Sequence, residues 1–286
     1  MKEGIVVKKI ANSFWVRLGD ETIVCSSPKK HKEIGVFVGD EVDVDLSEKQ
    51  IISVHERKNK LIRPPVANLS KLIIVIAPVP KPDLFMVDKL MLFCFVNNIA
   101  PVLCLNKMDI ADNDWICSVE AEYKNALKII KTSSKEGNVS ELLEELKGNI
   151  SALSGQSAVG KSALTKAIFP DRDVEVGELS RNYRGKNTTR HCELFQLDEN
   201  SFLVDTPGFT SLDEKLLMFP YFELPYLYPD FLEFHEGCKY KSCTHLKEDC
   251  CNVKNAVSEG KLSKDRYERY KIIFESLKKE WVKNHG

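Results

Sequence analysis

The chain has 286 residues, a net charge of −1 and nine cysteines, with 43% hydrophobic and 29% charged residues. This composition is typical of a soluble globular protein and excludes a disordered chain, a collagen and a small disulfide scaffold. No apolar run reaches the ~18 residues that a membrane-spanning helix requires, and no apolar leader is visible. We therefore expect a cytoplasmic protein without membrane contact, whose cysteines are reduced or bind metal.

The first 62 residues carry the pattern of a small antiparallel barrel. Five short segments of strand-forming residues recur at intervals of roughly ten residues, and Gly19-Asp20 and Gly39-Asp40 separate them as turns. The segment Arg63-Pro64-Pro65 breaks the pattern, so we expect a linker there and a domain boundary after residue 62. The expected strands are residues 5–7, 14–18, 21–25, 41–44 and 50–54.

Between residues 63 and 216 the pattern changes to buried strands that alternate with helices. Helical stretches separate the apolar runs; in one, at 138–147, Asn138 is the expected N-cap and Gly148 follows the end. The alternation predicts an α/β domain with a mostly parallel sheet covered on both faces. The expected strands are residues 72–77, 101–105, 127–130, 149–153 and 201–204.

The region 217–286 is rich in aromatic residues, then in Cys and His, and ends in a helix. Apolar residues of this helix step by three and four, which forms one stripe along it. Core packing is the favoured interpretation of the stripe, and a partner surface is the alternative. Its members are Tyr267, Tyr270, Phe274, Leu277 and Trp281.

Residues 155–162 fit the phosphate-loop motif G-x-x-x-x-G-K-[ST], between an expected strand and an expected helix. The glycines let successive N–H groups point at phosphate oxygens, and the helix N-terminus adds positive potential. Lys161 can reach the outer phosphates, and the Ser162 hydroxyl can bind Mg²⁺. The expected nucleotide contacts here are Gly155, Gln156, Ser157, Ala158, Val159, Gly160, Lys161, Ser162 and Ala163.

A second loop, Asn106-Lys107-Met108-Asp109, follows the expected strand 101–105. The Asp109 carboxylate can accept hydrogen bonds from N1–H and the 2-amino group of guanine, which adenine cannot donate, so it can discriminate strongly between the two bases. Lys107 can lie along the base, Asn106 can brace the loop, and Met108 contributes backbone and packing. Ser133 follows the next expected strand, where a backbone N–H can meet the guanine oxygen.

A third group of residues suits Mg²⁺ and the γ-phosphate. Asp205 ends the last apolar run and can hold Mg²⁺ through water, while the Gly208 N–H can face the γ-phosphate. A threonine of the basic segment 181–190 can complete the Mg²⁺ shell; Thr189 is the first choice and Thr188 the second. This segment is either a solvated loop or a contact for RNA phosphates.

The order of these motifs differs from that of Ras-like GTPases, in which the phosphate loop comes first. Here the guanine loop 106–109 precedes the phosphate loop 155–162, which precedes Asp205, and a circular permutation explains this order. Together with its flanks, the chain closely resembles the circularly permuted ribosome small-subunit-dependent GTPase A family of bacteria. The resemblance implies an N-terminal all-β OB-fold barrel (1–62), a circularly permuted α/β P-loop GTPase domain (63–216) and a mainly helical zinc-binding domain (217–286).

The family's zinc module has the spacing Cys-x4-Cys-x-His-x5-Cys, which Cys238, Cys243, His245 and Cys251 fit. Three thiolates and an imidazole can complete a tetrahedral, structural Zn²⁺ shell. Cys250 competes for the last position, although the spacing favours Cys251. The remaining cysteines lie in or beside apolar stretches and are expected in the core: Cys25, Cys94, Cys104, Cys117 and Cys192.

The resemblance also implies Mg²⁺-assisted hydrolysis of GTP to GDP and phosphate, stimulated by the small ribosomal subunit during its late maturation. The partners would be that subunit and its rRNA, and we expect a monomer. Two departures bear on catalysis: Asn187 stands where the family often has His, and Phe209 follows Gly208 where many GTPases have Gln. The residues expected to serve hydrolysis are Lys161, Thr189, Asp205 and Gly208.

Two alternatives stay open on the sequence alone. The chain can be an RNA-binding assembly protein that uses GTP as a non-hydrolysed switch. It can also be a P-loop kinase or ATPase, against which the guanine loop at 106–109 argues.

Overall fold

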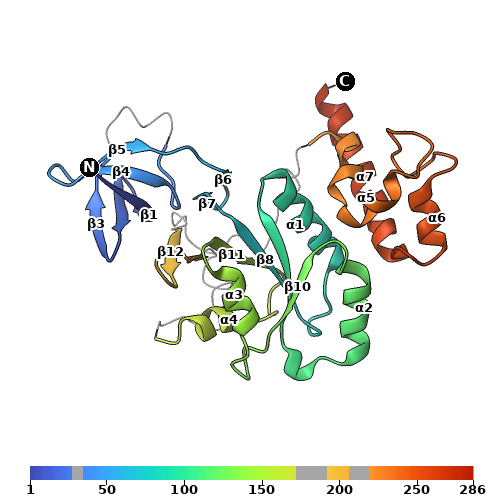
Figure 1. Cartoon of the computed structure of the whole chain (residues 1–286), viewed down its shortest axis with the longest axis horizontal. Helices are drawn as coiled ribbons and strands as arrows, with labels where there is room; N and C mark the ends of the chain where they lie inside the picture. The colour runs from blue at the N-terminus through green and yellow to red at the C-terminus, as the bar shows by residue number, and fades with distance from the viewer. Residues whose placement is uncertain (28–34, 172–191, 206–218, 286) are drawn as a thin grey trace.

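The structure is a computed structural model and describes residues 1–27, 35–171, 192–205 and 219–285. Three regions follow one another along its longest axis: a β-rich N-terminal region, a central α/β region and a helical C-terminal region (Figure 1). Within the described residues no helix is both long and apolar enough to span a membrane.

The N-terminal region is a set of short antiparallel strands around its own core. Strand β1 pairs with β2 and β4, β2 pairs with β3, and β4 pairs with β5. Ser26, directly after β3, forms a bridge to Gln50 at the start of β5, which brings the two ends of the set together. The predicted barrel-like strands are thus confirmed. Their bounds are β1 (Lys2–Ile10), β2 (Ser13–Leu18), β3 (Glu21–Cys25), β4 (Glu41–Asp45) and β5 (Gln50–Val54).

The expected linker at Arg63-Pro64-Pro65 instead belongs to an antiparallel hairpin, β6 (Lys60–Ile62) and β7 (Pro65–Ala67), whose turn is Arg63-Pro64. Proline is tolerated here because Pro65 is the first residue of its strand. Leu61 and Val66 lie opposite each other and are both buried, so the hairpin belongs to the core. The prolines therefore mark the turn and the strand start of a hairpin, and not a linker.

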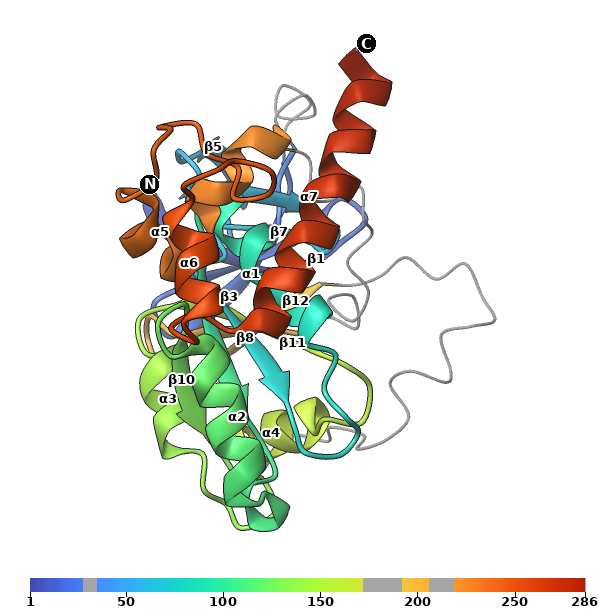
Figure 2. The ribbon, with the colours of Figure 1, turned by 90° about the vertical axis from the view of Figure 1, so that its right-hand side faces the viewer.

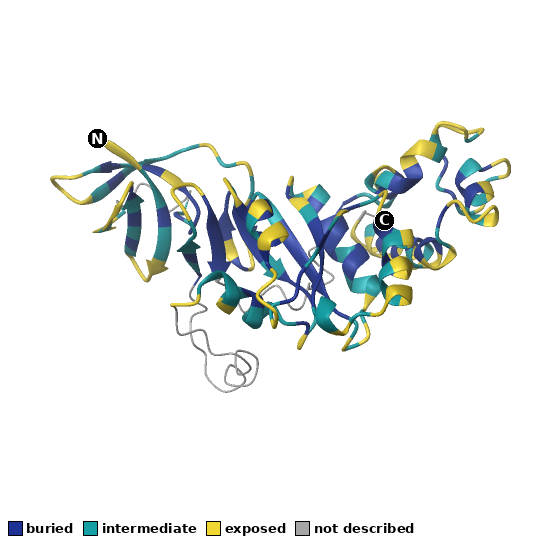
Figure 3. Ribbon diagram, turned by 60° about the horizontal axis from the view of Figure 1, so that its bottom comes forward, coloured by how far each residue is buried: buried dark blue, intermediate teal, exposed yellow. Residues whose placement is uncertain are grey.

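The central sheet has the strand order β10-β9-β8-β11-β13-β12, in which the first five strands are parallel and β12 is antiparallel. Strands β8, β9, β11 and β13 are mostly buried on both faces, which explains their continuous apolar runs, whereas β10 and β12 are only partly buried. The sheet forms the dark-blue centre of Figure 3. The bounds are β8 (Lys71–Ile76), β9 (Ala100–Leu105), β10 (Lys128–Lys131), β11 (Ile150–Ser154), β12 (Glu193–Gln196) and β13 (Phe202–Asp205).

Helices cover the two faces of this sheet, as predicted. Leu72, Ile74 and Ile76 of β8 share a core with α1 (Leu84–Val96) and α2 (Asn113–Tyr123). The alternate residues of β8, Ile73 and Val75, share the other core with α3 (Ser140–Leu146) and α4 (Lys161–Ile168). The side-chain alternation along one strand therefore divides the helices between the faces.

One strand pair joins the N-terminal region to the central sheet. Strand β1 pairs antiparallel with β12 at Lys8 and Glu193, whose side chains form an ion pair with an N–O distance of 2.7 Å. The hydrogen-bonded sheet therefore continues from one region into the other.

The C-terminal region packs beside α1 and α2, and the end of α7 projects beyond it (Figure 2). The predicted apolar stripe of α7 is confirmed as core packing, because Tyr267, Tyr270, Phe274 and Leu277 are buried, while Trp281 is half-buried. The elements are η5 (Tyr221–Leu227), α5 (Pro229–His235), α6 (Asn252–Ser258) and α7 (Lys264–His285).

A buried ion cluster holds this region against α1. The fully buried Arg266 of α7 pairs with Asp88 of α1 and Asp230 of α5. Arg269, one turn further along α7, pairs with Asp88 and with Glu122 of α2. Two arginines of α7 thus form largely buried ion pairs with carboxylates of α1, α2 and α5.

Candidate functional site

The three predicted nucleotide loops that the structure describes follow the carboxyl ends of neighbouring parallel strands. The loop at 106–109 follows β9, Thr132 and Ser133 follow β10, and Gly155 follows β11. Because these strands run in the same direction, their ends meet at one edge of the sheet, where ligands of α/β proteins bind. Segments up to 49 residues apart in the sequence, from Asn106 to Gly155, are therefore brought together.

Glycine is required at both ends of the phosphate loop. Gly155 has a φ of +138°, and a Cβ atom there would lie 2.1 Å from the Val75 carbonyl oxygen of β8. Gly160 has a φ of +101°, and its Cβ would lie 2.3 Å from Nδ2 of Asn106. The loop is therefore packed directly against the strand beside it and against the guanine loop. Ala158 also adopts a positive φ of 66° between them, a conformation that costs an L-residue roughly 1–2 kcal/mol.

Lys161 lies within the phosphate loop at the start of α4. Its Nζ donates to the carbonyl oxygens of Gly155 at 2.7 Å and Gln156 at 2.6 Å. Burial lowers the pKa of Lys161 to about 8, because the ammonium is removed from water. The partners of this ammonium are two neutral carbonyl oxygens, and a bound phosphate would give it a negatively charged one. Ser162 and Ala163 follow in the first turn of α4, and Ser157 and Val159 lie in the loop itself.

Asn106 braces three loops at once. Its Nδ2 donates to the Val159 carbonyl oxygen at 2.9 Å, and its Oδ1 accepts from the Thr132 hydroxyl at 3.0 Å. Both Asn106 and Thr132 are fully buried, so water cannot replace either hydrogen bond. The expectation that Asn106 braces the loop agrees with this geometry. Thr132 lies in the segment that was expected to meet the guanine oxygen through a backbone N–H, but its side-chain bond to Asn106 was not predicted.

The two remaining polar residues of the guanine loop are positioned by its neighbours. Oδ1 of Asp109 accepts from the Ser133 hydroxyl at 2.8 Å, which leaves Oδ2 for other donors, with Lys135 3.7 Å away. The Ser133 N–H donates to the Asn138 carbonyl oxygen, so Ser133 contributes through its hydroxyl in this structure. Nζ of Lys107 donates to the Val79 and Ala158 carbonyl oxygens and spans the guanine and phosphate loops. Met108 begins the one-turn helix η2 (Met108–Ile110).

The expected γ-phosphate and Mg²⁺ residues are placed less completely. Asp205 is the last residue of β13, which pairs in parallel with β11, so its backbone reaches the same edge as the phosphate loop. Thr188, Thr189, Gly208, Phe209 and Asn187 lie outside the described residues.

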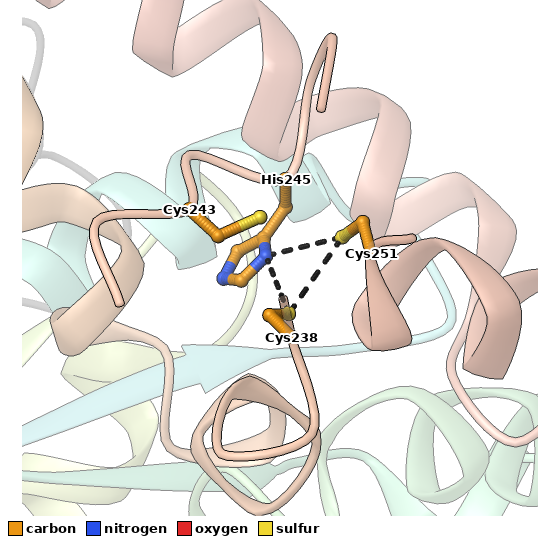
Figure 4. Close-up of side chains that lie close together, drawn as sticks. All are labelled: Cys238, Cys243, His245 and Cys251. Carbon is orange, nitrogen blue, oxygen red and sulfur yellow. Dashed lines mark hydrogen bonds between the residues drawn. The ribbon is translucent and has the colours of Figure 1, made fainter. Parts of the chain in front are cut away.

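The four predicted zinc ligands come together in the C-terminal region. Cys238, Cys243, His245 and Cys251 place their ligand atoms within 4.8 Å of one another, and three of the four residues are buried. Nδ1 of His245 faces the Sγ atoms of Cys251 at 3.3 Å and Cys238 at 3.7 Å (Figure 4). Cys250 is exposed and is not part of this group, which agrees with the choice of Cys251.

The chemistry of these four groups suits a metal ion. Burial, followed by the nearby His235, lowers the pKa of His245 to about 4, so the ring is neutral at pH 7, the form that binds metals. Burial raises the pKa of Cys243 to about 12, because its thiol lies among other thiols away from water. A bound cation would stabilise the thiolate form of these clustered cysteines, which burial alone disfavours. The site could therefore hold one metal ion, and the soft thiol set suits Zn²⁺.

A second set of residues, not predicted from the sequence, holds the metal-binding loop in place. The Glu248 carboxylate accepts from the backbone N–H groups of Thr244, Leu246 and Lys247. Although burial opposes the shift, these hydrogen bonds and that of the Thr244 hydroxyl lower the pKa of Glu248 to about 2. From α7, the Tyr267 and Tyr270 hydroxyls donate to the carbonyl oxygens of His245 and Thr244.

The predicted core position of Cys117 is wrong: this residue is exposed on α2, whereas Cys25, Cys94, Cys104 and Cys192 are buried. Cys117 lies beside apolar residues in the sequence, but α2 buries only Val119 and Tyr123 fully. Position on the helix, and not neighbouring composition, decided its exposure.

Comparison with known proteins agrees with this architecture. The family model described as RsgA GTPase matches residues 54–215, which is more than half of the chain. The chain belongs to the RsgA GTPase family. It is therefore a GTPase, and its strand order is that of a circularly permuted member of the class.

Relatives and solved structures cover nearly the whole chain. The protein named small ribosomal subunit biogenesis GTPase RsgA from Clostridium acetobutylicum is 39% identical over 277 residues, 94% of this chain and 95% of its own. The protein of the same name from Clostridium botulinum is 36% identical, with 98% and 100% covered. The crystal structure of YjeQ from Thermotoga maritima has a TM-score of 0.81 and 32% identity, covering 96% of this chain and 98% of its own. The structure of YloQ, a circularly permuted GTPase, has a TM-score of 0.80 and 28% identity, covering 98% and 96%.

Proposed function

We propose that this RsgA-family GTPase hydrolyses GTP to GDP and phosphate in the late maturation of the small ribosomal subunit, and that the subunit stimulates its activity. The observation that carries the choice of GTP is the bracing of the guanine and phosphate loops by Asn106, which holds Asp109 and Lys161 at one sheet edge. The role in ribosome biogenesis rests on the names of the relatives, which agree over nearly the full length of this chain.

In this proposal, each loop has a distinct role. Asp109 accepts from the guanine N1–H and 2-amino group, and Asn106, Lys107 and Ser133 hold the loop that presents it. Lys161 and the backbone N–H groups of the phosphate loop stabilise negative charge on the phosphates. The remaining proposed nucleotide contacts are Met108, Gly155, Gln156, Ser157, Ala158, Val159, Gly160, Ser162 and Ala163.

The proposed Mg²⁺ ligands are Ser162, Thr189 and Asp205, with Gly208 facing the γ-phosphate. Hydroxyl and carboxylate oxygens are the ligands that Mg²⁺ prefers. The phosphate loop that precedes Ser162 follows β11, and Asp205 ends the adjacent parallel strand β13. When bound, Mg²⁺ would neutralise phosphate charge as the bond to the leaving group breaks. In this proposal the residues named above hold the nucleotide so that a water molecule can attack the γ-phosphate opposite the leaving group.

We also propose that the Cys238, Cys243, His245 and Cys251 site holds one structural Zn²⁺. A closed set of four protein ligands leaves no position for a substrate, so the ion would hold the loop between α5 and α6 together. The domain boundaries at residues 62/63 and 216/217, the monomeric state and the rRNA contacts of the two outer domains belong to the same proposal. Metal analysis of the purified chain tests the ion: one zinc per chain is expected, and none would contradict it.

The experiment that tests the main proposal is phosphate release by the purified chain with and without isolated small subunits. We expect slow release alone and a strong increase with subunits, and competition by GDP but not by ATP. Subunit binding that depends on GTP, with no phosphate release in either condition, would instead favour the non-hydrolysed switch. Equal competition by ATP would contradict the assignment of the guanine loop.

A further inference from the structure

A histidine outside the proposed ligand set contacts the ligand histidine on the side of its ring that faces away from the thiols. His235 is the last residue of α5, ten positions before His245, and its Nδ1 lies 3.0 Å from Nε2 of His245. The two rings are nearly perpendicular, with an interplanar angle of 88°. Thus the nitrogen of His245 that faces away from the thiols has one ring nitrogen as its partner.

The second nitrogen of His235 determines where the protons lie. Nε2 of His235 is 3.0 Å from the Lys241 carbonyl oxygen, which can only accept a hydrogen bond. The proton of a neutral His235 ring therefore sits on Nε2, and its Nδ1 carries a lone pair. That lone pair requires Nε2 of His245 to donate, so the lone pair of His245 is on Nδ1, the atom that faces Cys238 and Cys251.

We propose that His235 is a positioning residue of the metal site, which fixes the tautomer and the ring orientation of His245 so that Nδ1 is presented to the ion. This inference rests on the proposed zinc site and extends it by a residue outside the four ligands. Metal-binding histidines in general donate their second N–H to a fixed acceptor, and losing such a partner typically costs 10–100-fold in metal affinity.

The surroundings explain why the acceptor must come from the chain. His245 is fully buried, so water cannot take the place of Nδ1 of His235. Phe231 lies edge-on to the His245 ring at a centroid distance of 6.2 Å and offers shape but no acceptor. Tyr226 holds His235 in place, because its ring packs on His235 and its hydroxyl donates to the same Lys241 carbonyl oxygen.

The test compares three full-length variants by competition for Zn²⁺ with a chromophoric chelator. His235→Phe keeps an aromatic ring but removes the acceptor, and it should bind zinc roughly 10–100-fold more weakly. His235→Asn places an amide oxygen near the position of Nδ1 and should recover most of this loss. Tyr226→Phe is the matched control, since it removes the other donor to the Lys241 carbonyl oxygen and leaves both imidazoles; it should stay close to wild type.

A second readout needs no variant. Long-range ¹H–¹⁵N NMR of the zinc-bound wild-type chain should give a metal-bound Nδ1 and a protonated Nε2 for His245. Coordination through Nε2, or a His235→Phe variant with wild-type zinc affinity, would overturn the role of His235 while the zinc site stands. A wild-type chain that binds no zinc would overturn the site itself and this inference with it.

Discussion

One carboxylate at position 109 carries the proposed base specificity, and its surroundings make it a clean target. The Ser133 hydroxyl occupies Oδ1 at 2.8 Å, and an asparagine would keep that acceptor. Asp109→Asn should therefore leave the loop folded but oppose the guanine donors with an NH₂ group. Loss of hydrogen bonds to a charged group predicts GTP binding about 10–100-fold weaker, with binding of XTP gained. Fluorescent-nucleotide titration measures both.

The control is Lys135→Gln. This side chain is 80% exposed and lies 3.7 Å from Oδ2 of Asp109, so its loss should change GTP affinity by less than about twofold. If Asp109→Asn keeps wild-type affinity for GTP, the base is bound elsewhere.

The phosphate loop should bind GTP with uptake of a proton. Because the pKa of Lys161 is lowered to about 8, the free chain loses this proton as the pH rises through 8, whereas the unfolded chain keeps it. Phosphate favours the ammonium, so GTP affinity should fall as the pH rises above 8, and the free chain should become more stable between about 8 and 10.5. Calorimetry at a pH of about 8.5, in two buffers of different ionisation enthalpy, measures the number of protons taken up on GTP binding.

Lys161→Arg is the control for this linkage, because a guanidinium stays protonated at every pH used. When this variant binds GTP, the side chain at position 161 should take up no proton. The same uptake in both proteins would assign the titration to another group.

The residues that carry the motifs were predictable, whereas their partners were not. The motif chemistry identifies Asn106, Asp109 and Lys161, since only certain residue types can serve guanine and phosphate. Thr132 and His235 carry no such signature, because each acts through one hydrogen bond that exists only in the folded chain. Spacing likewise identified the four proposed Cys and His ligands but not Glu248, whose carboxylate accepts hydrogen bonds from the backbone of their loop.

At the scale of elements, strands with continuous apolar runs were predicted nearly residue by residue, while the turns were not. Asn138 is not the N-cap of α3, because its backbone exchanges hydrogen bonds with Ser133, and the helix begins at Ser140. The β6–β7 hairpin was missed because its three-residue strands are too short to show alternation. Strand β12 was also missed, since it is held by pairing with β13 and β1. Long-range pairing determines such elements.

The junction of the strand ends of β9, β10 and β11 should depend on one hydroxyl. Thr132→Val keeps the side-chain shape but removes the donor to Asn106, which leaves a buried acceptor unpaired. The free energy of unfolding should fall by about 1–3 kcal/mol, and GTP affinity should fall with it. Urea unfolding and nucleotide titration measure the two effects.

The matched control is Ser151→Ala on β11. Its hydroxyl is also buried, but no hydrogen-bond partner is present for it in the described structure. Removing it should be neutral or slightly stabilising. Equal losses for both variants would mean that Thr132 contributes only packing.

At the scale of the whole molecule, the two outer regions are attached to the central one by different means. The N-terminal region continues the sheet through β1 and β12, where the Lys8–Glu193 pair is partly exposed. The C-terminal region is instead held by the buried pairs of Arg266 with Asp88 and Asp230, with the Arg266 guanidinium over the Tyr123 and Tyr228 rings. The sequence predicted the three regions but not these attachments, since ion pairs between distant segments leave no local pattern.

The buried cluster should therefore contribute far more to attachment than the exposed pair. Arg266→Met fills a similar volume but leaves Asp88 and Asp230 without their shared partner, and it should cost about 3–5 kcal/mol in urea unfolding. Lys8→Met, which breaks the partly exposed pair, should cost no more than about 1 kcal/mol. Adding Asp88→Asn to Arg266→Met should recover part of the loss, because Arg269 is then the only arginine left in the cluster and has one carboxylate fewer to balance. That double-mutant cycle isolates the coupling across the interface, since Asp88 belongs to the central region and Arg266 to the C-terminal helix. Strictly additive losses would show that the two residues stabilise their own regions separately and do not join them.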